Sequence, residues 1–190
     1  DHRLPKMTYL AFDDPFALSR EDFVRLGLAA QPDDGSGLHY SDKTLDEFER
    51  FIELGVFSEA DRVELIGGEL VPMSPKGARH DNLRTFLQAA LQRQLREDVF
   101  VHIEIGWRPD EAQYIEPDIL LAELGADPVR TRAEKVLLLI EVANSSLSYD
   151  LKVKSGVYAA LGVGEYWVVD ARRLVTHVHR MPSAGGYASV

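Results

Sequence analysis

Two apolar runs in the second half of the chain constrain the fold more than any other feature of the sequence. They are "YIEPDILLA" at 114–122 and "KVLLLIEVA" at 135–143. Each run is apolar at both odd and even positions, which is typical of central strands covered on both faces. A third run, "GEYWVVDA" at 164–171, has the same pattern. The sequence therefore predicts a central sheet with two covered faces.

Helical patterns alternate with these strands. "HDNLRTFLQAALQRQLRED" at 80–98 predicts the clearest helix, and "YDLKVKSGVYAALG" at 149–162 predicts another despite Gly156. Alternation predicts further strands at 100–109 and 174–180. The apolar face of the first helix consists of Leu83, Phe86, Leu87, Ala90, Leu91 and Leu95. The order helix, strand, strand, strand, helix, strand indicates an α/β core with a mixed sheet.

A helix and a hairpin precede this core. "TLDEFERFIELG" at 44–55 opens with a capping box of Thr44 and Glu47. "RVELIGGELVPM" at 62–73 has two short apolar strands around a Gly-Gly link, which predicts a hairpin with a primed turn.

Residues 1–43 are predicted to form an N-terminal extension that is partly loop. Ser19 and Asp22 at capping-box spacing predict a short helix at 19–29, and composition predicts a loop at 31–37. We place the main domain at 44–190.

The composition of the chain excludes several kinds of site and segment. The chain has no cysteine, which excludes disulfides and thiolate metal sites and fits a cytoplasmic protein. No apolar run approaches the roughly 20 residues of a membrane-spanning helix. The formal net charge of −10 argues against broad electrostatic binding to nucleic acid, although bound divalent cations would offset it locally.

Two acids stand where acids are energetically costly. Asp118 follows Pro117 at the start of one apolar run, and Glu141 lies inside another. Because an unpaired buried carboxylate is strongly destabilising, a basic group, hydrogen bonds or a metal must compensate. If the two strands pair, the acids converge near one sheet edge, and convergent carboxylates suit Mg²⁺ or Mn²⁺.

The helix after Glu141 supplies a cation. By helical spacing, Lys154 shares a face with Asp150 and Tyr158, whereas Lys152 points away from that face. Lys154 is therefore the predicted inward lysine. An ammonium beside a metal-bound water can orient that water and stabilise charge developing on a phosphate.

Each candidate also has a purely structural interpretation, and the pattern alone leaves it open. Asp118 could end a turn, and Lys154 could be an exposed helix lysine. Glu141 could be the ion-pair partner of Arg108 or Lys154 without any chemistry. His80 at a helix start is by default a cap or packing residue.

Other residues carry weaker signals. Glu64 lies in a hairpin strand and is by default a solvated outward side chain. His177 and His179 alternate on a predicted edge strand, which is a weak metal signal. Three aromatic residues are predicted to belong to the core: Tyr158, Tyr166 and Trp167.

Several ordered motifs resemble a known family. They are "VELIGGELVPMSP" followed by His80, "YIEPDILL" and "LLIEVANSSLSYDLKVKSGVYAALGVGEYWVVD". From about residue 44 to residue 180 the chain resembles the Uma-two family of bacterial restriction-endonuclease-like proteins, a branch of the PD-(D/E)XK nuclease superfamily. The resemblance implies the restriction-endonuclease-like core already described, with the helix and hairpin as its N-terminal extension.

The resemblance also assigns residues. The superfamily's proline-aspartate corresponds to Pro117-Asp118 and its second acid to Glu141. The usual lysine two residues after the second acid is replaced here by Ala143, and the family has its lysine at the position of Lys154 instead. Glu64 and His80 also match family positions, and the resemblance implies a metal-ligand role for His80.

The chemistry implied by the resemblance is hydrolysis of DNA by a Mg²⁺- or Mn²⁺-dependent endodeoxyribonuclease. Asp118, Glu141 and His80 would hold the metal, Lys154 would act on water and phosphate, and Glu64 would assist. The resemblance further implies a homodimer. A catalytically inactive interaction module with the nuclease fold is the alternative, favoured by the charge of −10. A hydrolase of smaller phosphoesters is a third interpretation.

Overall fold

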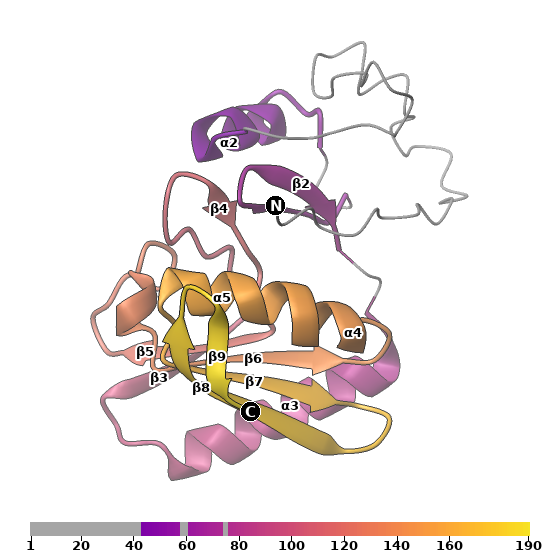
Figure 1. The fold of residues 1–190 in the computed structure, drawn as a ribbon, viewed down its shortest axis with the longest axis vertical. Coiled ribbons are helices and arrows are strands. Elements are labelled where there is room, and N and C mark those ends of the chain that lie inside the picture. The colour runs from indigo at the N-terminus through magenta and orange to yellow at the C-terminus, as the bar shows by residue number, and fades with distance from the viewer. Residues whose placement is uncertain (1–42, 58–60, 74–75) are drawn as a thin grey trace. The chain divides into compact units, whose positions relative to one another are not determined.

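A six-stranded mixed sheet forms the centre of the computed structural model, which describes residues 43–57, 61–73 and 76–190 (Figure 1). The strand order is β3-β5-β6-β7-β8-β9, and all neighbours are antiparallel except β6 and β7. The strands are β3 (Val99–Ile103), β5 (Ile119–Glu123), β6 (Leu138–Ala143), β7 (Glu165–Asp170), β8 (Val175–Ser183) and β9 (Gly186–Ser189). The predicted α/β class with a mixed sheet is confirmed.

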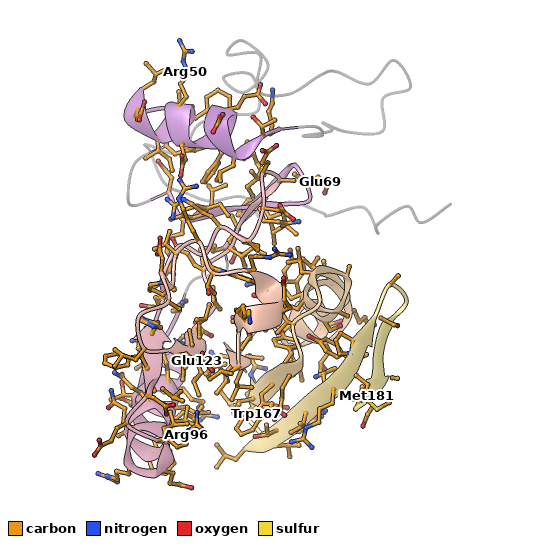
Figure 2. All side chains as sticks on the ribbon, turned by 90° about the vertical axis from the view of Figure 1, so that its left-hand side faces the viewer. Arg50, Glu69, Arg96, Glu123, Trp167 and Met181 are labelled. Carbon is orange, nitrogen blue, oxygen red and sulfur yellow. The ribbon has the colours of Figure 1, made fainter. Side chains whose placement is uncertain are left out.

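Helices cover both faces of this sheet, as the apolar runs predict. On one face, α3 (Ala78–Gln94) contributes Leu87 to a cluster that contains Ile140. Trp167 of β7 lies in the same layer between sheet and helix (Figure 2). On the other face, Tyr158 packs in a cluster with Leu139. The covering segment there consists of α4 (Leu147–Tyr149), the π-helical turn η2 (Asp150–Lys154) and α5 (Ser155–Leu161).

The predicted hairpin belongs to a second sheet, of order β2-β1-β4. Gly67 and Gly68 have φ of 60° and 81°, the left-handed values that a primed two-residue turn requires. The predicted capping box is also present: the Glu47 N–H donates to Thr44 Oγ1 at 3.3 Å, and the Thr44 N–H donates to Glu47 Oε2 at 2.9 Å. The elements are α2 (Leu45–Glu53), β1 (Val63–Ile66), β2 (Glu69–Pro72) and β4 (Gln113–Tyr114).

The strand predicted at 100–109 is wrong beyond Ile103. Glu104 has φ of 49°, a left-handed conformation that turns the chain out of the strand. Trp107 instead forms an isolated bridge with Ile115.

The strand predicted at 114–122 is two separate pieces. Tyr114 pairs with β1 in the smaller sheet, and β5 begins only at Ile119. Pro117 lies at the break, and its missing N–H cannot join a ladder. Asp118 is therefore the residue immediately before the strand.

The helix predictions also need two corrections. Phe86, predicted on the buried face of α3, is 68% exposed, because it lies outside the arc of Leu83, Leu87 and Leu91 that contacts the sheet. In the second helix, residues Asp150–Lys154 form a π turn.

The remaining predictions concern the ends of the chain. β9 pairs with β8, so the strand predicted at 174–180 is not an edge strand. The helix predicted at 19–29 and the loop predicted at 31–37 lie outside the described residues. None of the helices in the described part is long and apolar enough to cross a membrane.

Candidate active site

Three acids lie side by side on neighbouring strands: one just after β3, one just before β5 and one within β6. The register pairs the last residue of β3 with the first of β5, and the first of β5 with Ile140 of β6. One step further, the same register places Glu104 and Glu141 on either side of Asp118. The Glu104 N–H donates to the Asp118 carbonyl at 3.3 Å. The structure thus brings Asp118 opposite Glu141 and adds Glu104.

Asp118 is buried, and both of its carboxylate oxygens are engaged. Lys76 Nζ donates to Oδ1 at 2.7 Å, while Val142 N–H donates to Oδ2 at 2.7 Å and His80 Nε2 lies 2.9 Å from Oδ2. Burial by itself raises the pKa of this carboxyl, but the His80 hydrogen bond and the Lys76 charge lower the pKa of Asp118 well below its ordinary value. Asp118 is therefore an ionised carboxylate inside the core.

Glu141 faces the helical segment on the opposite side of the sheet from α3. Lys154 Nζ donates to its Oε1 at 2.9 Å, and Tyr158 Oη donates to the same oxygen at 2.8 Å. Burial raises the pKa of Glu141, the Lys154 charge lowers it, and the net pKa lies above the ordinary value. For Lys154, burial lowers the pKa, but the charges of Glu141 and Glu64 raise it well above the ordinary value. The lysine is therefore charged.

Glu64 joins this ion pair from β1. It is only 2% exposed, so the default interpretation of an outward solvated side chain is wrong. Its Oε1 accepts from Lys154 Nζ at 3.0 Å and from the Glu116 N–H at 2.9 Å. Leu65, on the opposite face of the strand, is also buried, so β1 is covered on both faces. Lys154 is consequently held between two buried carboxylates.

The π turn η2 presents Lys154 to these acids. Lys154 is buried whereas Lys152 is exposed, which confirms the predicted inward lysine. A π turn adds one residue to a helical turn and often marks a functional site. Arg108, the other predicted partner for Glu141, instead pairs with Glu49 at 2.6 Å.

His80 faces a carboxylate with each ring nitrogen. Nε2 lies 2.9 Å from Asp118 Oδ2, and Nδ1 lies 3.1 Å from Asp81 Oδ1. Burial lowers the pKa of His80, but the bond to Asp118 outweighs it and the net pKa is raised. In this arrangement Nε2 carries a proton and has no lone pair for a metal. The ligand role predicted for His80 stays a prediction, and it requires that proton to leave.

The site has a shortage of positive charge. Burial raises the pKa of Asp150 to about 6, although the Lys154 charge and the Ser146 hydrogen bond oppose the rise. The buried carboxyl groups here are Glu64, Asp118, Glu141 and Asp150, and the groups facing them are the ammonium groups of Lys76 and Lys154 and the His80 imidazole.

Oxygen donors with unbalanced negative charge fit a hard divalent cation. Asp118 and Glu141 would hold it. Across residues 43–57, 61–73 and 76–190, however, no group of three or more His, Cys, Asp or Glu side chains is arranged to hold a metal ion. Metal binding therefore requires side chains to move, because Lys76 and His80 engage the oxygens of Asp118.

Sequence reasoning missed Lys76, Glu104 and the hydroxyl of Tyr158 as parts of the site. Lys76 precedes α3 and follows no periodic pattern, so nothing marks it. Glu104 alternates with His102 and Arg108 on the polar side of its stretch, so the pattern does not distinguish it from a solvated side chain. Tyr158 lies four residues after Lys154, and that spacing predicts a shared helix face.

The histidine pair on β8 does not belong to this site. The His179 ring packs 5.3 Å from the ring of Tyr166 and 5.6 Å from the ring of Tyr187, measured between centroids. His179 is thus part of an aromatic cluster on the last strands.

Comparison with known proteins places the chain in a family. The model of the Uma2 family, described as "Putative restriction endonuclease", matches residues 45–190. The chain belongs to the Uma2 family. Its fold is similar to that of a "putative nuclease belonging to DUF820" from Anabaena variabilis, with a TM-score of 0.55 and 14% identity over 74% of this chain and 86% of that one. No curated protein matches. The predicted family and the restriction-endonuclease-like fold are both confirmed.

Proposed function

We propose that this Uma2 protein is a divalent-metal-dependent endonuclease that hydrolyses DNA phosphodiester bonds. The observation that carries the proposal is the pair formed by Asp118, immediately before β5, and Glu141, within β6, with the Lys154 ammonium 2.9 Å from Glu141. Two carboxylates and one lysine are the groups that metal-assisted phosphodiester hydrolysis needs. The nuclease family and fold support the assignment.

Each side chain has a distinct task in this mechanism. Asp118 and Glu141 bind Mg²⁺ or Mn²⁺, which when bound lowers the pKa of a water and polarises the phosphate. Lys154 orients the attacking water and neutralises charge that develops on the phosphate oxygens. Glu64 fixes the Lys154 ammonium, and Tyr158 fixes the Glu141 carboxylate.

The test is a nicking assay on supercoiled plasmid with Mg²⁺ or Mn²⁺. We expect the wild type to nick DNA and Asp118→Ala to lose nicking by at least about 100-fold, because the metal site is lost. Asp98→Asn, at an exposed carboxylate paired with Arg96, is the matched control and should nick like the wild type. Equal nicking by the wild type and Asp118→Ala would refute the proposal, as would no nicking of duplex, single-stranded or branched DNA. Parallel RNA substrates decide whether cleavage is confined to DNA.

A second candidate is a catalytically inactive interaction module with the nuclease fold. The observation that favours it is the saturated hydrogen bonding of Asp118, together with the net charge of −10. Calorimetric titration with Mn²⁺ separates the two candidates. A nuclease must bind the ion at a site that Glu141→Ala abolishes, whereas a module with a closed ion-pair network binds none.

A further inference from the structure

Lys76 lies between two of the three neighbouring acids, Asp118 and Glu104. Its Nζ donates to Asp118 Oδ1 at 2.7 Å and to Glu104 Oε1 at 2.5 Å. The side chain of Lys76 is 13% exposed, so water reaches the edge of this contact. One ammonium therefore bridges two carboxylates at the place where the proposed metal ligand Asp118 has its Oδ1.

Asp118 has little capacity for another cation while Lys76 is bound. Its Oδ2 already faces two donors, the Val142 N–H at 2.7 Å and His80 Nε2 at 2.9 Å. The N–H is fixed in β6, and the imidazole is fixed on α3 by a second contact with Asp81 at 3.1 Å. Oδ1 faces Lys76 at the end of a flexible side chain. Lys76 is thus the partner that a metal ion can replace most easily.

Glu104 provides Lys76 with a second attachment. The left-handed φ of 49° at Glu104 ends β3 beside Asp118. The Glu104 Oε2 forms an ion pair with Arg84 of α3 at 2.5 Å, which leaves its Oε1 directed at Lys76. A lysine released from Asp118 would therefore stay at the site, bound to an anchored carboxylate.

We propose that Lys76 is an exchangeable counter-ion of Asp118. In the metal-free protein it neutralises the carboxylate, and on metal binding it yields Oδ1 to the divalent cation. It then remains on Glu104, where its ammonium faces the incoming phosphate. This inference rests on the proposed metal site. Lys76 has two opposite effects: bound to Asp118 it weakens metal binding, and bound to Glu104 it assists substrate binding.

The test is calorimetric titration of Mn²⁺ into the wild type, Lys76→Gln, Lys76→Arg and Lys152→Gln, each checked for folding by thermal melting. We expect Lys76→Gln to bind Mn²⁺ about tenfold more tightly, since a hydrogen bond to a charged group contributes on the order of a tenfold change in an equilibrium constant. Lys76→Arg keeps the competing charge and should not tighten binding. Lys152 is exposed, so Lys152→Gln should match the wild type.

Plasmid nicking by the same variants gives the second readout. Lys76→Gln should nick more slowly than the wild type at saturating Mn²⁺ while binding the ion more tightly, a split that a purely structural lysine would not produce. Equal or weaker Mn²⁺ binding by Lys76→Gln overturns the inference, and so does the absence of Mn²⁺ binding in all variants. Tighter binding with no nicking by any variant supports the exchange and refutes the proposed DNA cleavage instead.

Discussion

Two lysines each join two acids of the site, and the protein holds them with different firmness. The side chain of Lys154 is 7% exposed, and its partners Glu64 and Glu141 are 3% and 6% exposed. The side chain of Lys76 is 13% exposed; its partner Asp118 is 4% exposed, but its second partner Glu104 is 30% exposed. An ion pair that water reaches contributes little, whereas breaking a fully buried pair is strongly destabilising. We therefore expect Lys154 to be fixed and Lys76 to be exchangeable.

The largest expected effect comes from removing the charge of Lys154, the lysine that we expect to be fixed. Lys154→Met leaves Glu64 and Glu141 buried without their cation, so it should lower the free energy of unfolding by about 3–5 kcal/mol. Urea denaturation at pH 7 measures the change. Lys152→Met, two residues earlier at an exposed position, is the control and should change stability by less than about 0.5 kcal/mol. A Lys154→Met variant within about 1 kcal/mol of the wild type would contradict this view of the site.

The second prediction concerns how the free energy of unfolding depends on pH through Asp150, a buried carboxyl group near Lys154. Asp150 has a pKa raised to about 6 in the folded protein against an ordinary 3.8. Between these two pH values the folded state binds more protons than the unfolded state, so stability falls as pH rises through this window. Asp150→Asn removes this loss. Its stability relative to the wild type should increase by up to about 3 kcal/mol from pH 4 to pH 7.

Urea denaturation across that pH range measures the difference, and an asparagine can still accept the Ser146 hydroxyl. Asp127→Asn, at an exposed residue, is the control and should show no comparable rise between pH 5 and pH 7. A constant difference between Asp150→Asn and the wild type would show that burial does not raise the pKa of Asp150.

The contrast between the two lysines also explains what the sequence could predict. Lys154 lies in a periodic helix, so spacing alone places it inward, and the π turn moves it without changing that result. The apolar run around Glu141 places this acid in the covered sheet for the same reason. Lys154 and Glu141 belong to regular elements, whose period fixes the direction of each side chain, and Asp118 lies one residue before β5.

The other side of the site depends on irregular backbone. Glu104 reaches Lys76 through a left-handed residue in a stretch that alternation predicts as continuous strand. Lys76 precedes α3 and has no periodic neighbours. Glu64 is buried because both faces of β1 are covered, with Glu64 2% exposed and the next residue, Leu65, 0% exposed; local alternation does not show that a second face is covered. Contacts between separate helices, strands and loops cannot be predicted from the periodicity of side-chain directions within one element.

A third prediction tests whether the Tyr158 hydroxyl, which shares Glu141 with Lys154, contributes to catalysis. Tyr158→Phe removes the hydroxyl bound to Glu141 but keeps the ring that packs 4.8 Å from the ring of Tyr166. The loss should lower the free energy of unfolding by about 1–2 kcal/mol. Tyr187→Phe removes a comparable hydroxyl, bound to the Val163 carbonyl away from the site. Both variants should melt earlier, and only Tyr158→Phe should slow plasmid nicking; equal nicking rates would separate Tyr158 from the chemistry.

The smallest expected effect on stability belongs to Lys76. Lys76→Gln should lower the free energy of unfolding by about 1 kcal/mol or less in urea denaturation, because Asp118 keeps the Val142 N–H and His80 as donors. Lys76→Arg, which preserves the charge, should lie closer to the wild type. A loss for Lys76→Gln as large as that for Lys154→Met would mean that both lysines are fixed. A small loss means that Asp118 can release Lys76 cheaply, which is the condition for a metal ion to replace it.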